Sequence, residues 1–235
     1  MDSARHRLEH WVHLLLSASE MGGSRFHCSD EYESFPFLLH VLKVARSVRP
    51  DFSPEFVVKL AEPHFDAADF DATRFRAKLE SYRDALGVER IDCVQWMWRG
   101  DLKDDPGRVR GFASAADVFA RAVEEAKSIG AMRCVYCFPY TKTFADAAFD
   151  YPRIDGIAVY RNPLEMEYES LVVNAQQSGK EVLVIRPFKA GEALGADGVD
   201  ELVKFSARVP CVAGIVVSCS SGAHLARCVE AAAEC

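Results

Sequence analysis

A single charged side chain interrupts one of the most apolar stretches of the chain. Lys59 follows Phe56, Val57 and Val58 and precedes Leu60. A charge in such a stretch is costly unless it is paired or needed for chemistry. Lys59 is therefore a candidate for a functional ammonium group, and a lysine at the exposed end of a strand is the structural alternative.

A second group of residues suits an anion. Ser218–Cys219–Ser220–Ser221–Gly222 leads into a predicted helix that carries His224 and Arg227, and Arg186 and Lys189 follow an earlier predicted strand. Hydroxyl groups, a glycine and the N-terminus of a helix together bind phosphate readily. The pattern predicts a phosphate site, with a capped surface helix as the alternative.

Two of the eight cysteines, Cys134 and Cys137, form a C-x-x-C pair. The pair lies in an apolar run that predicts a strand, where residues three apart point to opposite faces. A redox C-x-x-C pair normally begins a helix, and no second pair at the spacing of zinc ligands accompanies this one. We therefore expect free structural cysteines and no metal site.

Short apolar runs recur along the chain from residue 25 onward. They are rich in Val and Ile and nearly continuous in apolar character, which is typical of strands buried on both faces of a parallel sheet. The predicted strands are Arg25–Cys28, Glu55–Leu60, Ile91–Trp96, Arg133–Cys137, Gly156–Tyr160, Glu181–Ile185 and Ala213–Val217.

Longer segments between these strands have apolar residues three and four positions apart, as amphipathic helices do. Gly130 and Gly179 follow two of them as C-terminal caps, and Ser114, Ser220 and Ser221 are candidate N-terminal caps. The predicted helices are Ser3–Ser19, Phe70–Leu86, Ala115–Ile129, Glu165–Ser178, Val199–Ala207 and Ala223–Ala232.

Strand and helix alternate seven times, which predicts a parallel sheet with crossover helices. Residues 101–111 are expected to form a surface loop. The length suits a single α/β domain over residues 1–235, a TIM-type (β/α)8 barrel, but the strand that should precede the first helix is missing or modified. Such a barrel is open at one seam, closed by rearrangement or completed by a second copy. Because an exposed edge favours association, we expect a homodimer or a covering segment.

Composition restricts the kind of protein. Hydrophobic residues make up 49% of the chain, which is ample for one buried core, and no stretch approaches the roughly 18–20 apolar residues of a membrane span. Charged residues interrupt the N-terminal segment, which argues against a secretory signal. The formal net charge of −7 disfavours a nucleic acid partner. We expect a cytoplasmic protein that acts on a small molecule.

Six local patterns, in order, resemble the aldo-keto reductase family over roughly residues 5–233. The resemblance implies a TIM-type barrel, NADPH bound across its C-terminal mouth, and reduction of a carbonyl group. The segments are Gly22–Tyr32 (family G-x-x-x-x-D-T-A-x-x-Y), Phe56–Lys59 (the strand that ends in the family lysine), Leu79–Asp92 (S-L-x-x-L-G-x-x-x-I-D), Ala126–Arg133 (A-x-x-x-G-K-I-R), Arg161–Leu164 (Y-N-P-L) and Arg186–Gly191 (S-P-L-x-x-G).

The resemblance implies catalytic roles for three residues. Tyr32 matches the family tyrosine that donates a proton, and Lys59 matches the lysine that makes this phenol more acidic, since a neighbouring ammonium favours the phenolate. His27 stands where the family has an aspartate paired with the lysine. A protonated His27 would repel Lys59, although a His–Tyr–Lys group suits acid–base chemistry near neutral pH. The carboxylates that could replace the aspartate are Asp30, Glu31 and Glu62.

Several residues of the family sites are replaced. Met97 stands in place of the substrate-orienting histidine, and a thioether donates no hydrogen bond to a carbonyl oxygen. The indole N–H of Trp96 or Trp98 could compensate, with core packing as the alternative. Phe138–Pro139 and Ala158 replace the three side chains that bind the nicotinamide carboxamide in the family.

The phosphate-binding pattern is closer to that of the family. The sequence thus leaves three functions open: NADP-dependent carbonyl reduction, a non-redox isomerase, dehydratase or lyase reaction on a phosphorylated or sugar-like substrate, and non-catalytic binding of a ligand or partner. The residues expected to bind the cofactor are Arg186, Lys189, Ser218, Ser220, Ser221 and Arg227.

Overall fold

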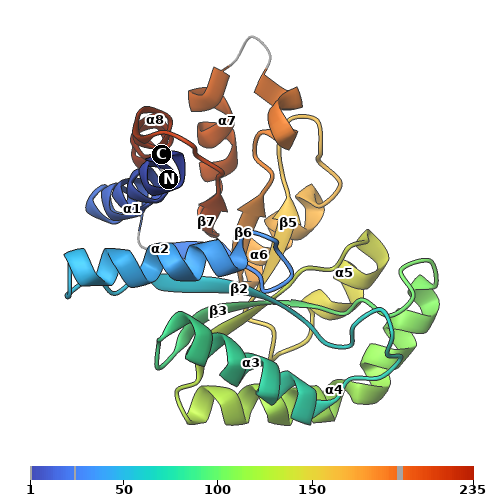
Figure 1. Ribbon diagram of the computed structural model, residues 1–235. Helices are drawn as coiled ribbons and strands as arrows, with labels where there is room; N and C mark the ends of the chain where they lie inside the picture. The colour runs from blue at the N-terminus through green and yellow to red at the C-terminus, as the bar shows by residue number, and fades with distance from the viewer. Residues whose placement is uncertain (1, 24, 195–197) are drawn as a thin grey trace.

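A computed structural model describes residues 2–23, 25–194 and 198–235 of the chain, with side chains from residue 6 onward. In these segments seven parallel strands lie in the order β1 to β7, each hydrogen-bonded to the next in sequence. The strands curve into a nearly closed barrel, with helices packed outside it (Figure 1). The predicted α/β barrel of the TIM type is confirmed.

The predicted strands agree with the observed ones to within one residue at each end. Near-continuous apolar runs are a strong signal where both faces of a strand are covered, as they are in β3. The strands are β1 (Arg25–Cys28), β2 (Glu55–Ala61), β3 (Ile91–Met97), β4 (Met132–Cys137), β5 (Gly156–Tyr160), β6 (Glu181–Ile185) and β7 (Val212–Val216).

The helices include three that the sequence analysis did not predict: α2, α5 and the short 3₁₀ helix η1. Helix α2 has Pro36 in its first turn, a position where proline is tolerated, and α5 is only eight residues long. The helices are α1 (Asp2–Glu20), α2 (Phe35–Val48), α3 (Ala72–Leu86), α4 (Asp105–Ser128), α5 (Lys142–Phe149), α6 (Glu169–Ser178), the short 3₁₀ helix η1 (Lys189–Leu194), α7 (Gly198–Ala207) and α8 (Gly222–Ala233).

The prediction of a surface loop over residues 101–111 was wrong at its second half. Helix α4 begins at Asp105, after Asp104 accepts a hydrogen bond from the backbone N–H of Gly107 at 2.9 Å. Pro106 lies in the first helical turn, where its missing N–H costs nothing. Ser114 is therefore inside the helix and is not a cap. By contrast, Ser221 caps α8 as predicted.

The barrel has a seam between β7 and β1. No hydrogen-bonded ladder joins these two strands in the part of the chain that the structure describes. Arg25 of β1 reaches across and donates to the carbonyl oxygen of Ala213 at 3.2 Å. Helices α1 and α8 lie side by side (Figure 1), and Leu14 packs with Leu225 between them. The missing first strand is thus confirmed, and the homodimer stays a prediction.

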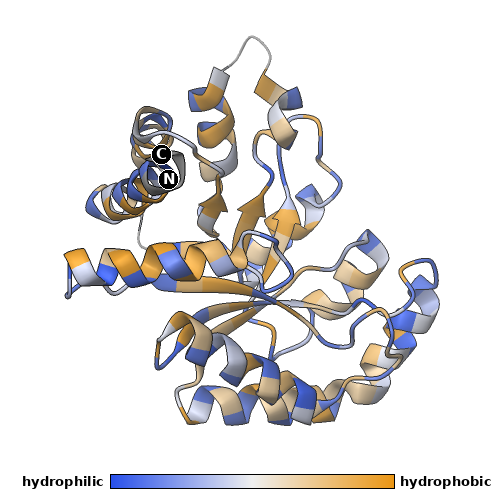
Figure 2. Ribbon diagram, viewed as in Figure 1, coloured by the Kyte–Doolittle hydropathy of each residue, from blue (hydrophilic) through white to orange (hydrophobic). Residues whose placement is uncertain are grey.

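Apolar side chains fill two layers, one inside the barrel and one between the strands and helices. Figure 2 shows mainly hydrophobic strands and helices of mixed character. Cys134 lies in the inner layer with Val57 and Met97, whereas Cys137 lies in the outer layer with Trp96. The two cysteines of the C-x-x-C pair therefore point to opposite faces, as predicted, and both are free thiols.

Polar side chains close the N-terminal end of the barrel. Arg25 pairs with Glu55 at 2.8 Å, and the hydroxyl of Tyr136 donates to the carboxylate of Glu181. The described helices include none that is long and apolar enough to cross a bilayer. The opposite, C-terminal end is the usual place of active sites in barrels of this kind.

Candidate active site at the barrel mouth

The structure brings together the three predicted catalytic residues. The ring centres of His27 and Tyr32 lie 6.4 Å apart, and the Lys59 ammonium lies 5.0 Å from the centre of the Tyr32 ring. His27 and Lys59 come from β1 and β2, and Tyr32 from the loop after β1. The ammonium therefore makes a cation–π contact with the phenol ring, at the C-terminal mouth of the barrel.

Partial burial and neighbouring charges shift the pKa values of Tyr32 and Lys59. Desolvation raises the pKa of Tyr32, and nearby acidic groups including Cys28 and Glu31 raise it further. Desolvation also lowers the pKa of Lys59, against an opposing effect of Glu31. The family resemblance implies a phenol made more acidic by its lysine, whereas here Tyr32 is protonated at neutral pH.

His27 is a neutral imidazole at neutral pH. Desolvation lowers its pKa, a hydrogen bond with Gln95 opposes this, and Lys59 lowers it further. The Nε2–H group of His27 donates to Oε1 of Gln95 at 2.9 Å. The repulsion expected between a protonated His27 and Lys59 is therefore absent. Gln95 was missed by the sequence analysis, although a buried glutamine within an apolar strand was the available signal.

A network centred on Arg99 completes the polar part of the mouth. Its two terminal nitrogens donate to the two carboxylate oxygens of Glu31, each at 2.6 Å. Its Nε donates to the hydroxyl of Tyr140 at 2.9 Å, and its Nη1 lies 2.7 Å from Nε2 of His64. Such a two-pronged pair fixes geometry as well as charge. The sequence analysis also missed Arg99, the second residue after β3.

The three candidate carboxylates have different partners. Glu31 is the one whose charge acts on Lys59. Asp30 accepts a hydrogen bond from the Tyr82 hydroxyl at 2.6 Å, on the side of α3. Glu62 is 5% exposed and accepts from the guanidinium of Arg74 at 3.0 Å. Of the three carboxylates, Glu31 is therefore the one that acts electrostatically on Lys59.

Tyr140 supplies a hydroxyl group beside Met97. This hydroxyl donates to the Met97 sulfur at 3.3 Å, and a thioether is a weak acceptor, so the proton is available to a better one. The indole of Trp96 instead donates to the carbonyl oxygen of Glu62 at 2.7 Å, in the outer layer. Trp98 is also in that layer, so core packing is the role of both tryptophans.

Aromatic rings line the mouth where the family binds nicotinamide. Phe138 is 4% exposed, and its ring centre lies 4.7 Å from that of Tyr140 and 5.4 Å from that of Tyr160. Ala158 is fully buried in the same cluster. These positions therefore form an apolar wall.

The residues predicted to bind phosphate form two groups. Ser218, Ser220 and Ser221 are exposed around the N-terminus of α8, and the hydroxyl oxygen of Ser221 accepts from the backbone N–H of His224 at 3.3 Å. The loop after β6 reaches this helix, because the ring centres of Phe188 and His224 are 5.8 Å apart.

The three cationic residues of that prediction each have an acidic partner. The shortest contacts are 3.7 Å from Arg186 to Glu165, 3.1 Å from Lys189 to Glu192 and 3.1 Å from Arg227 to Asp200. Because Glu192 and Asp200 are well exposed, these ion pairs are weak. Lys189 and Arg227 can therefore turn to a bound phosphate at small cost.

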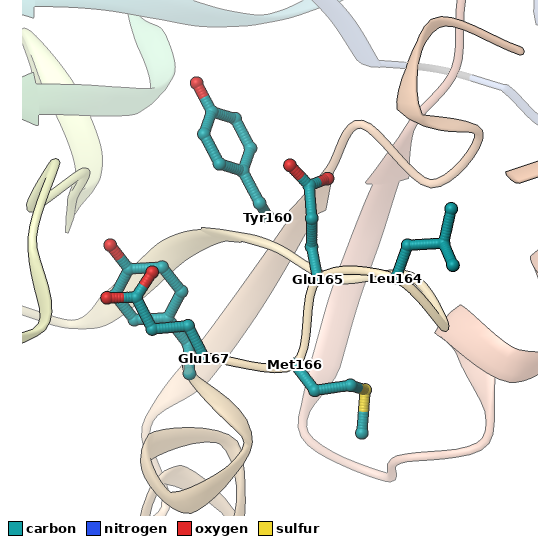
Figure 3. Close-up of a pocket in the computed structure, with 6 residues that line it drawn as sticks. Tyr160, Leu164, Glu165, Met166 and Glu167 are labelled. Carbon is teal, nitrogen blue, oxygen red and sulfur yellow. The ribbon is translucent and has the colours of Figure 1, made fainter. Parts of the chain in front are cut away.

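A hollow of about 300 Å³ opens beside the mouth. Figure 3 shows Tyr160 and Glu165 pointing to one side of the loop after β5, while Met166 points away. Arg186 lies over the Tyr160 ring, 4.8 Å from its centre. The lining residues are Tyr160, Leu164, Glu165, Met166, Glu167 and Tyr168.

The Glu31–Arg99 ion pair makes the free energy of unfolding depend on pH. Burial tends to raise the pKa of Glu31, but its hydrogen bonds and ion pair with Arg99 lower it overall. The stabilisation is therefore present above the unfolded pKa of about 4.3 and is lost as the pH falls through the lower folded value. We expect Glu31→Gln to lower the free energy of unfolding by about 1 kcal/mol at pH 7.

Urea unfolding at a series of pH values checks this expectation. The difference between wild type and Glu31→Gln should shrink as the pH falls below about 4.3. Glu33→Gln, an exposed carboxylate in the same loop, is the control and should change stability little. A constant difference across the pH range would show that the ion pair is not its cause.

Comparison with solved structures finds the same arrangement of strands and helices. A Pseudomonas aeruginosa protein assigned to the aldo-keto reductases superposes with a TM-score of 0.74, over 97% of this chain and 84% of that one, at 20% identity. The chain has the aldo-keto reductase fold. A Klebsiella pneumoniae aldo/keto reductase in complex with NADP and acetate gives 0.72, over 97% and 81% of the two chains, at 16% identity.

A third solved structure agrees with these two. The holo form of an aldo-keto reductase from Bacillus halodurans gives a TM-score of 0.71, over 94% of this chain and 80% of that one, at 17% identity. The sequence matches no protein-family model and no curated protein. The likeness is therefore one of fold.

Proposed function

We propose that this chain is an NADP-dependent carbonyl oxidoreductase of the aldo-keto reductase type, with Tyr32 as the proton donor. The observation that carries the proposal is the convergence of His27, Tyr32 and Lys59 at the C-terminal mouth of the barrel. The similar Klebsiella pneumoniae structures hold NADP and NADPH. We also propose a single domain over residues 1–235 and a cytoplasmic location.

The phosphate end of such a cofactor fits the residues present. Exposed hydroxyls of Ser218, Ser220 and Ser221 surround the first turn of α8, whose backbone N–H groups favour an anion. Lys189 and Arg227 are close enough to solvent to join them. The nicotinamide end would instead rest on the aromatic wall, held by surface contact rather than by the carboxamide hydrogen bonds of the family.

The chemistry divides between the cofactor and the protein. When bound, NADPH supplies a hydride to the carbonyl carbon. The protein supplies the proton: Tyr32 gives its phenolic hydrogen to the carbonyl oxygen as that oxygen gains negative charge, and an alcohol results. Lys59, at 5.0 Å from the ring centre, then stabilises the phenolate that remains. The Tyr140 hydroxyl orients the carbonyl oxygen in place of the histidine that Met97 replaces.

The protonation state of Tyr32 suits the role of proton donor. Its raised pKa keeps the phenol protonated at neutral pH, which is the form that gives a proton to the carbonyl oxygen. Lys59 contacts the phenol ring, and we propose it as the group that stabilises the phenolate.

Calorimetric titration with NADPH tests the proposal, followed by a carbonyl panel monitored through the loss of NADPH absorbance. We expect saturable binding in the micromolar range and carbonyl-dependent oxidation of the cofactor. Absence of binding at millimolar NADPH would overturn the proposal and favour a non-redox reaction in the same cleft.

A further inference from the structure

Three metal-binding side chains meet beside the seam of the barrel. Cys219 lies in the loop after β7, and His224 and Cys228 lie four residues apart on α8. Residues at this spacing share one face of a helix. One thiol sulfur from each cysteine and one imidazole nitrogen lie within 4.8 Å of one another. Loop and helix thus bring three soft donor groups to one point.

One nitrogen of the His224 imidazole lacks a hydrogen-bond partner. Its Nε2 atom is buried and has no hydrogen-bond partner, and a buried polar atom without a partner normally costs stability. The ring is held in place against Phe188, with ring centres 5.8 Å apart. The two thiol sulfurs lie within 4.8 Å of each other and of an imidazole nitrogen. A bound cation would satisfy all three groups at once.

We propose that Cys219, His224 and Cys228 form a binding site for Zn²⁺ or a similar transition-metal ion. Two thiolates and one imidazole are a typical donor set for zinc and unsuited to Mg²⁺ or Ca²⁺. With zinc bonds of about 2.3 Å to sulfur and 2.0 Å to nitrogen, tetrahedral ligand atoms are roughly 3.5–3.8 Å apart. Because the three atoms lie within 4.8 Å of one another, metal binding needs them to move closer by at most about 1 Å.

Metal binding would release protons from the two thiols. Two neutral thiols and a neutral imidazole take up one Zn²⁺ and release two protons to solvent, which leaves two thiolates on the metal. The fourth position is left to water or a small ligand, as in open zinc sites. No change of oxidation state is involved.

The position of the site gives the metal a structural effect. It would join the loop after β7 to the first two turns of α8, next to the β7–β1 seam where Leu225 packs against α1. The same loop contains Ser218, Ser220 and Ser221, the proposed phosphate-binding residues. The metal site itself does not rest on the proposed function, because its donors are separate from those hydroxyls.

Cobalt titration of the full chain tests the site. The protein is stripped with a chelator, kept reduced with a phosphine, and titrated with Co²⁺ and then Zn²⁺. We expect one equivalent of Co²⁺, the visible bands of tetrahedral cobalt, and thiolate-to-cobalt charge transfer, all removed by one equivalent of Zn²⁺. Zinc at a hundredfold excess over Kd should raise Tm by roughly 5–10 °C.

Variants locate the site. Cys228→Ser, Cys219→Ser and His224→Ala should each weaken Co²⁺ binding by roughly a hundredfold or more, whereas Cys235→Ser, an exposed cysteine outside the group, should not. Cys219 is half-exposed in a loop, so its variant keeps the test valid if Cys228→Ser fails to fold. Unchanged binding in Cys219→Ser, a spectrum without thiolate charge transfer, or no binding by the reduced protein would each overturn the proposal.

Discussion

Replacing Tyr32 with phenylalanine is expected to lower kcat for NADPH-dependent carbonyl reduction by roughly a hundredfold to ten-thousandfold. The change removes one oxygen atom and leaves the ring under Lys59, so the cation–π contact survives. Because the side chain is 40% exposed, the fold should tolerate the loss. The Kd for NADPH should stay within about twofold, which separates a lost proton donor from a lost binding site.

Steady-state kinetics and calorimetry of the same preparation measure both quantities. Tyr151→Phe is the matched control, since the Tyr151 hydroxyl donates to the carbonyl oxygen of Ala116 on the outer side of the barrel. It should leave kcat unchanged. Full activity in Tyr32→Phe would remove Tyr32 from the mechanism, and Tyr140, whose hydroxyl lies beside Met97, would become the better candidate for the proton donor.

The sequence predicted the strands well because those in the middle of the sheet, such as β3, are buried on both faces. An apolar run such as Ile91–Trp96 has few alternative interpretations once helices flank it. Helix starts were harder, since Pro106 and Gly107 are as common in loops as in first turns. The capping bond of Asp104 decides between these two, and it depends on side-chain geometry that composition does not contain.

The candidate site was predictable only where one strand or one short loop sets the spacing. His27, Tyr32 and Lys59 were predicted from the resemblance to the family motifs, and β1 and β2, which are parallel neighbours, bring them together. The partner of Arg99 did not follow, because Glu31 is 68 positions away in the chain and the register between loops is set by packing. The local sequence likewise could not show that Glu31, rather than Asp30, acts electrostatically on Lys59.

The cysteines show the same limit. We expected no metal site because the sequence contains no second C-x-x-C pair. That reasoning assumes that metal ligands occur as pairs close in sequence. Cys219, His224 and Cys228 follow a different spacing, C-x-x-x-x-H-x-x-x-C, across a loop and a helix. The spacing places two ligands on one helix face, but only the path of the loop after β7 brings the third to them.

Replacing Gly156 with alanine is expected to destabilise the barrel by about 3 kcal/mol or more. Gly156 of β5 lies in register between Tyr136 of β4 and Glu181 of β6. The Tyr136 side chain crosses over it to donate to the Glu181 carboxylate. A Cβ atom at residue 156 would lie 2.3 Å from the Glu181 carbonyl oxygen and 2.9 Å from the Tyr136 ring.

The Glu181 backbone and the Tyr136 ring cannot both move away from the added Cβ atom, because β5 is hydrogen-bonded to β4 on one side and to β6 on the other. Urea unfolding followed by circular dichroism measures the loss. Gly214→Ala is the matched control, a glycine of β7 whose added Cβ would lie 3.4 Å from the flexible end of Leu183; it should cost less than about 1 kcal/mol. Equal stability of the two variants would mean that Tyr136 does not span β5. Of the two polar contacts described at the N-terminal end of the barrel, the ion pair between Arg25 and Glu55 would then be the one that remains.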